Sequence, residues 1–147
     1  MAIAERRKLR NSRFIARLTK PADLRAHTGA TEMKIATQVL DSTYGKPAVG
    51  VRARLSRGTG DGWTAVAETD TDIDGRIEDW DSWRLERGLY RIVFDSDSYF
   101  ADLGGIAAYP EVVLIFRVQD ESNVLQVQVT LAPYSYSTYF CTLENRP

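Results

Sequence analysis

The chain has 147 residues and a net charge of −1, with 44% hydrophobic and 27% charged residues, as expected for one globular domain. No apolar run approaches the roughly 20 residues that a membrane-spanning helix needs, so we do not expect a membrane protein. The single cysteine, Cys141, excludes an intramolecular disulfide framework and suits a reducing compartment.

The charge is distributed unevenly along the chain. Residues 1–20 hold seven basic residues and one acidic residue, a net charge of +6, which leaves −7 on the remaining residues. Such a segment could bind nucleic acid or an acidic partner, or it could be an organelle transit peptide or a flexible solubilising tail. We favour a flexible basic extension over residues 1–33, with no nucleic-acid partner and a cytoplasmic location. A transit role stays open.

The only histidine, His27, precedes the first strand pattern, so the predicted folded domain contains none. This excludes Ser-His-Asp and Cys-His nucleophilic arrangements and histidine-ligated metal sites from that domain. The acidic stretch 70–81 does not have the spacing of an EF-hand calcium loop, and we interpret it as a solvated acidic loop. We therefore expect no metal site.

From residue 34 onward the sequence predicts short β-strands. Apolar and polar residues alternate, as in half-buried strands, over the segments 34–41, 51–57, 63–69, 89–95 and 123–132. Glycine-containing turns fall at 42–50 and 58–62, and Asp74-Gly75 marks a tight turn before a short strand around Ile77.

Three further segments complete the predicted domain of residues 34–143, which a tail of residues 144–147 follows. The apolar run 112–120 predicts a central strand that is packed on both faces, and 134–143 predicts the last strand. The segment 96–111 holds the only predicted helix, which begins at a Ser or Asp N-cap and ends at Gly104-Gly105. Seven or eight short strands favour an antiparallel sandwich or barrel.

Several motifs follow one another in an order that resembles a known family. They read "IATQVLDSTYGKPAVGVRARL", "TDIDGRI", "GLYRIVFDSDSYF", "YPEVVLIFRV" and "LAPYSYSTYF". Over residues 34–142 the chain resembles the transthyretin and 5-hydroxyisourate hydrolase family. The resemblance implies an all-β, transthyretin-like antiparallel sandwich of two four-stranded sheets with one short helix.

The resemblance also implies an assembly and a reaction. Four subunits would form a homotetramer, a dimer of dimers, with a small-molecule ligand in its central channel. The family's hydrolases open the ring of 5-hydroxyisourate in urate breakdown without a metal or an organic cofactor, so we expect none here. The hormone-carrying members only bind ligands in the same channel.

The hydrolases of this family carry their site in three segments. An early strand reads Ser-Thr-His-Val-Leu-Asp, and "ATQVLD" puts Gln38 at the histidine. The Asp-Gly-Arg turn is intact and supplies Arg76. A late strand reads His-Tyr-His-Val-Pro-Leu-Leu, which puts Gln126 at the second catalytic histidine, with Val124 and Gln128 at the neighbouring histidine and proline positions.

The chain also departs from the family at its end. The family's Tyr-Arg-Gly-Ser reads "YFCT" here, so Tyr139 is kept, Phe140 and Cys141 replace arginine and glycine, and Thr142 retains a hydroxyl. We expect Arg76, Gln38, Gln126 and Tyr139 to act on the substrate, and Thr142, Cys141 and Gln128 to bind it. A glutamine on a strand's polar face is more often merely solvated, and an unactivated cysteine is by default an inert small residue.

Glutamine donates and accepts hydrogen bonds but cannot titrate as histidine does near neutral pH. Three hypotheses follow. The first, which we favour, is a diverged enzyme of specialised metabolism. It would promote cyclisation, isomerisation or ring opening of a small oxygen-rich or heterocyclic metabolite by positioning and electrostatics. The second is a non-catalytic carrier. The third is a 5-hydroxyisourate hydrolase with an altered site.

Overall fold

The computed structural model describes residues 34–80, 85–119 and 124–143. The chain divides into two units after Thr31, and every described residue lies in the second unit, Glu32–Pro147. The extension predicted for residues 1–33 and the tail predicted for 144–147 therefore lie outside the described residues, as do residues 81–84 and 120–123.

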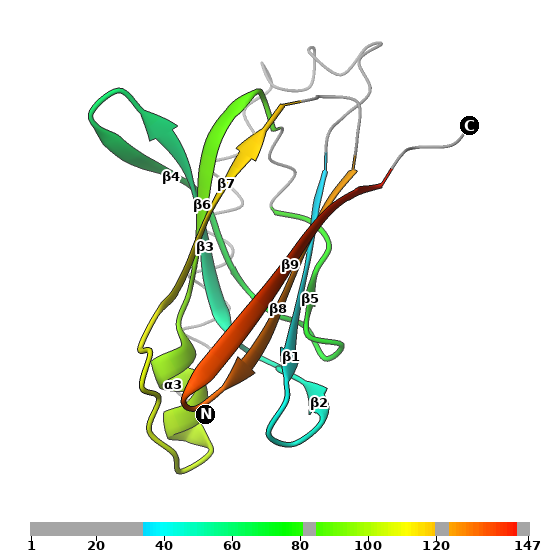
Figure 1. The fold of residues 1–147 in the computed structure, drawn as a ribbon, viewed down its shortest axis with the longest axis vertical. Helices are drawn as coiled ribbons and strands as arrows, with labels where there is room; N and C mark the ends of the chain where they lie inside the picture. Colours follow the sequence, from blue (N-terminus) through cyan, green and yellow to red (C-terminus); the bar gives the residue numbers. More distant parts are fainter. Residues whose placement is uncertain (1–33, 81–84, 120–123, 144–147) are drawn as a thin grey trace, which may run out of the picture. The chain divides into compact units, whose positions relative to one another are not determined.

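Two β-sheets form most of the described part (Figure 1). The first contains β1 (Ile35–Asp41), β2 (Lys46–Pro47), β5 (Arg76–Ile77), β8 (Val124–Ala132) and β9 (Ser135–Leu143). The second contains β3 (Arg52–Thr59), β4 (Gly62–Asp70), β6 (Gly88–Phe94) and β7 (Val112–Val118). Their orders are β2-β1-β8-β9, with β5 also on β1, and β4-β3-β6-β7. This confirms the predicted all-β sandwich of two sheets.

The pairing within the first sheet differs in detail from a fully antiparallel sheet of four strands. β1 and β8 run parallel, whereas the other pairs of strands run antiparallel. The two-residue strands β2 and β5 both pair with β1, which makes this sheet five-stranded. Alternation along a sequence shows which face a residue occupies but not the direction in which its strand is paired, so these features were not predicted.

The core lies between the sheets and takes every second residue of the central strands. In β8, Leu125, Val127, Val129 and Leu131 are all buried, and the residues between them are partly exposed. β1 has the same alternation. Because neighbouring residues of a strand point to opposite faces, the remaining residues of β1 and β8 form the outer face of the first sheet.

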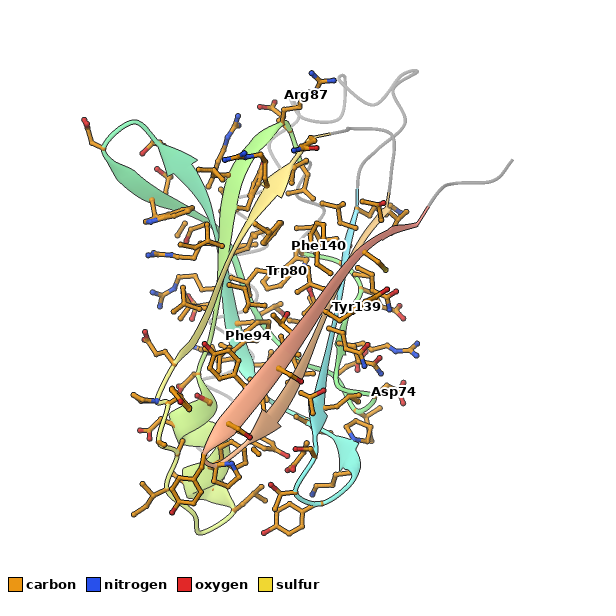
Figure 2. All side chains as sticks on the ribbon, viewed as in Figure 1. Asp74, Trp80, Arg87, Phe94, Tyr139 and Phe140 are labelled. Carbon is orange, nitrogen blue, oxygen red and sulfur yellow. The ribbon has the colours of Figure 1, made fainter. Side chains whose placement is uncertain are left out.

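Aromatic side chains fill the space between the sheets. Trp80, which follows β5, is buried, and its indole Nε1 donates a hydrogen bond to Thr37 Oγ1 at 3.3 Å. Phe140 of β9 is labelled in Figure 2. It packs against Phe116 of β7 with ring centroids 5.7 Å apart, so a contact joins the two sheets.

The segment 112–120 is not the central strand that its apolar run predicted. β7 pairs only with β6 and forms an edge of the second sheet. Its outward residues are exposed, with 41% of Val113 and 59% of Ile115 accessible. The strongly apolar composition of this segment therefore reflects a strand whose outer side chains remain uncovered in the single chain, rather than burial on both faces.

The predicted helix is confirmed as α3 (Ser96–Asp102). Its N-cap is Asp95, whose carboxylate accepts a hydrogen bond from the backbone of Ser98 at 3.0 Å. The helix ends at Leu103, followed by Gly104 with a φ of 79°. Within the described ranges, no helix is long and apolar enough to cross a membrane.

A buried carboxylate joins this helix to the first sheet. Asp41, at the end of β1, is 1% exposed, and Tyr99 of α3 donates its hydroxyl to Asp41 Oδ2 at 2.6 Å. The backbone N–H groups of Thr43 and Tyr44 donate to Asp41 Oδ1 at 2.9 and 3.1 Å. Burial and the hydrogen bond to Asp41 raise the pKa of the Tyr99 hydroxyl above its ordinary value. Asp41 therefore fixes the end of β1 both to the helix, through Tyr99, and to the turn that follows, through Thr43 and Tyr44.

The turn before β5 places Arg76 beside β1. Asp72 Oδ1 accepts hydrogen bonds from the backbone of Asp74 at 2.9 Å and of Arg76 at 2.8 Å. Gly75 has a φ of 71°, and its carbonyl accepts a hydrogen bond from Val39 N at 2.7 Å. A Cβ on Gly75 would overlap the carbonyl oxygen of Val39. Only glycine satisfies both the left-handed conformation and this close approach.

We expect Gly75→Ala to lower the free energy of unfolding by about 3 kcal/mol or more, because it adds left-handed strain and a steric clash. The matched control is Gly45→Ala, at a φ of 64° with open space around an added Cβ, for which strain alone predicts a loss of about 1–2 kcal/mol. Urea unfolding of both variants at one protein concentration measures the difference. Equal losses of unfolding free energy in the two variants would show that the close approach of Gly75 to β1 does not affect stability.

Candidate functional site

Four of the predicted site residues lie in one row across the outer face of the first sheet. Gln38 pairs with Arg76 of β5 on one side and with Gln128 of β8 on the other. Gln128 in turn pairs with Tyr139 of β9. Residues paired across neighbouring strands point to the same face. We call Arg76, Gln38, Gln128 and Tyr139 the outer row.

The outer row faces away from the core because its neighbours in sequence are buried. Val39, Ile77, Val127 and Val129 are each at most 4% exposed. The side chain of Arg76 is 52% exposed and Tyr139 is 63% exposed, while Gln38 and Gln128 are half-buried. The row therefore changes from exposed groups at its ends to partly covered amides at its centre.

Gln126 lies in an adjacent second row, opposite Ala36 of β1 and Cys141 of β9. The Cys141 thiol lies 3.7 Å from Gln126 Oε1 and donates a hydrogen bond to it. Gln38 therefore has Gln128, not Gln126, directly beside it. Cys141 is separated from Arg76 by β8 and β1, so the thiol and the guanidinium come from strands at opposite edges of the sheet, on the same face.

Thr142 is the one predicted site residue that the structure does not bring to the outer face. It pairs with Leu125, which is buried, so it lies on the opposite face of β9 from Cys141. Its position near the end of β9 leaves it exposed. The hydroxyl retained in the sequence is therefore not part of the same surface as the glutamines.

The charge at the site comes from Arg76. Its Nη1 lies 4.0 Å from Oε1 of Glu78, and 75% of the Glu78 side chain is exposed. An exposed ion pair at this distance contributes little, because water screens it and both side chains lose freedom. The guanidinium therefore remains available to an anionic or carbonyl group of a ligand.

The polar groups of the outer row retain free hydrogen-bonding capacity. Among the described residues, neither the side-chain amides of Gln38 and Gln128 nor the Tyr139 hydroxyl has a hydrogen-bond partner. Of the buried side-chain polar atoms in the described part, only Arg91 Nε lacks a partner, so these amides are open to solvent or ligand. The row presents an array of donors and acceptors that protein groups do not satisfy.

The acidic stretch near the site serves the fold. Asp72 stabilises the turn before Arg76, and Asp70 accepts a hydrogen bond from Arg52 at 3.3 Å. No cluster of His, Cys, Asp and Glu side chains that would hold a metal ion occurs in the described ranges. These contacts therefore give Asp70 and Asp72 structural roles, and the solvated loop predicted for residues 70–81 stays a prediction.

Chemically, the outer row can bind and polarise but offers no imidazole for proton transfer. Arg76 supplies a fixed positive charge with forked donors, and each glutamine supplies two donors and one acceptor oxygen. Tyr139 adds a hydroxyl. The arrangement suits a small ligand rich in carbonyl or enolate oxygens.

Comparison with known proteins places this fold in a family. The model of the HIUase/Transthyretin family matches residues 35–140. The 5-hydroxyisourate hydrolase of Deinococcus radiodurans is 40% identical over 118 residues, which cover 77% of this chain and 95% of that protein. The 5-hydroxyisourate hydrolase of Mus musculus is 33% identical over 114 residues, covering 75% and 97% respectively.

Solved structures of proteins named transthyretin and 5-hydroxyisourate hydrolase have a similar fold. Transthyretin from Sparus aurata superposes with a TM-score of 0.69 at 26% identity, covering 75% of this chain and 97% of that one. Klebsiella pneumoniae 5-hydroxyisourate hydrolase superposes with a TM-score of 0.65 at 26% identity, covering 73% and 96%. With the sandwich and the matched segment taken together, the chain belongs to the HIUase/Transthyretin family.

Proposed function

We propose that the outer row binds a small oxygen-rich or heterocyclic metabolite and promotes its ring opening, isomerisation or cyclisation. The observation that supports this most is that four side chains with free hydrogen-bonding capacity lie in register across four adjacent strands. The chemistry rests on positioning and electrostatics, because none of the four residues of the row is a histidine that could transfer protons near neutral pH.

Each member of the row has a defined role in this proposal. Arg76 stabilises negative charge that develops on a carbonyl or enolate oxygen, and Tyr139 donates to a second oxygen. The amides of Gln38 and Gln128 orient the ring, while Gln126 and Cys141 border it. General acid-base catalysis by a side chain contributes about 10²–10⁴-fold, and the site lacks that contribution from histidine. One well-placed oxyanion donor contributes about 10²–10³-fold, enough for a substrate with a low intrinsic barrier.

We further propose that four copies assemble as a dimer of dimers and that the outer row lines the channel between them. β7 and β9 are both edge strands, and each carries exposed apolar side chains, among them Ile115 and Phe140. Unpaired edges of this kind favour pairing with a second copy, which removes them. The half-buried amides would then face the corresponding surface of another subunit.

Two other functions have specific support. The names of the relatives favour hydrolysis of 5-hydroxyisourate with an altered site, because several are 5-hydroxyisourate hydrolases. The likeness to a sea bream transthyretin in complex with thyroxine, with a TM-score of 0.69, supports a carrier that only binds. The experiments below separate these functions from the one we propose.

The decisive activity test is the decay of freshly generated 5-hydroxyisourate, followed by absorbance. We expect little acceleration by the natural chain, and a gain of at least about 100-fold in the variant Gln38→His/Gln126→His, because proton transfer is restored. Thr130→His is the control, since it places an imidazole on the same face outside both rows. Rapid decay with the natural chain would instead establish the altered hydrolase.

The role of Arg76 is tested with barbiturate, a planar and oxygen-rich heterocyclic anion, by isothermal titration calorimetry. We expect Arg76→Ala to weaken binding by about 10–100-fold, because charge-assisted hydrogen bonds are lost. Arg54→Ala is a matched control: Arg54 is 54% exposed and paired with a glutamate at 3.5 Å, but lies in the second sheet. Equal affinities of the natural chain and Arg76→Ala would place the site elsewhere.

The affinity for barbiturate should stay constant within about twofold from about pH 5.5 to 8. Arg76 remains charged throughout this range, and the amides do not titrate. Calorimetric titrations at intervals across the range measure this dependence. A change centred near the ordinary pKa of histidine, about 6.5, would reveal a titrating base that the described residues of the row do not contain.

A further inference from the structure

The central pair of the outer row has a geometry that selects among ligands. Gln38 and Gln128 are direct partners in the parallel pairing of β1 and β8. Neighbouring strands lie about 4.8 Å apart, so the two side chains leave the sheet side by side. Both are half-buried and point to the same face. The two carboxamides therefore form one contiguous polar surface.

The two glutamines of β8 differ in what they can offer a ligand. The oxygen of Gln126 already accepts a hydrogen bond from the Cys141 thiol, and its partner on β1 is Ala36, which has no polar group. The side chain of Gln128 has no hydrogen-bond partner among the described residues, and its partner on β1 is a second free amide. The amide of Gln126 is therefore hydrogen-bonded within the protein, whereas the amide of Gln128 is available to a ligand.

A pair of adjacent carboxamides matches one chemical group particularly well. Each amide has an acceptor oxygen and N–H donors, so the pair can accept from a ring N–H and donate to the carbonyl oxygens beside it. That alternation of carbonyl and N–H is the edge of a cyclic imide or lactam. Arg76 flanks the pair on one side and Tyr139 on the other.

We infer that Gln128 is the specificity-determining residue of this site and that, with Gln38, it recognises the carbonyl–N–H–carbonyl edge of a planar heterocyclic anion. The inference rests on the proposed function, because it assumes that the outer row binds the ligand. It adds that the ring N–H is itself recognised, so that charge and carbonyl oxygens alone do not suffice.

The test compares barbiturate with 1,3-dimethylbarbiturate, which keeps the negative charge and the carbonyl groups but has methyl groups in place of both N–H groups. Calorimetry on the full chain should show that barbiturate binds about tenfold more tightly or better, as expected when a buried acceptor loses its donor. Gln128→Leu should weaken barbiturate binding about tenfold and abolish the discrimination between the two probes.

Two further variants complete the experiment. Thr130→Val, on the same strand and face but outside both rows, should leave affinity and discrimination unchanged. Gln128→Thr removes the amide while keeping a residue that suits a β-strand, and it should reproduce the loss seen with Gln128→Leu. Circular dichroism and the oligomeric state of each variant must match those of the natural chain for its affinity to be compared.

The outcomes separate this inference from the proposed function. Binding that depends on Arg76 but does not change in the Gln128 variants would overturn the role of Gln128 and leave the proposed site intact. Loss of discrimination in Gln126→Leu with none in Gln128→Leu would reassign the role to the second row. If the natural chain binds neither probe, both the inference and the proposed site fail.

Discussion

The parallel hydrogen bonding between β1 and β8 decides which side chains meet in this protein. The two strands are far apart in the sequence, yet their register puts Gln38 directly beside Gln128. A shift of one residue would turn the amides into the core and the valines into solvent, so burial of the apolar set holds the register. The arrangement of the site is therefore a consequence of core packing, and the turn that brings Arg76 to β1 adds the charge to a surface that is already defined.

The chain has the fold of its family, and we propose that it carries a different set of reactive groups. The resemblance places Arg76, in its Asp-Gly-Arg turn, and Tyr139 at positions that the family's hydrolases share, and it places amides at both positions of catalytic histidines. An amide preserves reach and hydrogen bonding but removes proton transfer near neutral pH. In the proposed site, this exchange would retain the groups that hold an oxygen-rich ligand and remove one group that could transfer a proton to or from it. This combination favours a related ligand with altered chemistry over the loss of all function.

Much of the fold could be predicted from the sequence, and particular residues show where prediction stopped. Alternation identified β1, β3 and β8, and a Ser or Asp N-cap with Gly104-Gly105 predicted the helix, whose N-cap the structure shows to be Asp95. The run 112–120 was misinterpreted, because apolar composition does not distinguish a strand buried on both faces from an edge strand with uncovered side chains. Strand direction and register also have no local signal, so the sequence did not show that Gln38 meets Gln128 or that Thr142 lies on the other face. The extension, its role and the cellular location stay predictions.

The alternation of β1 and β8 also separates two kinds of evolutionary constraint. Residues such as Val39 and Val127 are fully buried, and a change in their side-chain volume disturbs the packing of the core and lowers stability. The positions between them are only half-buried, so exchanging one polar side chain for another costs less stability there than in the core. Within a single strand, every second residue is therefore free to explore new chemistry while its neighbours preserve the framework. A family built on such strands can change its reaction by a few substitutions and keep its architecture.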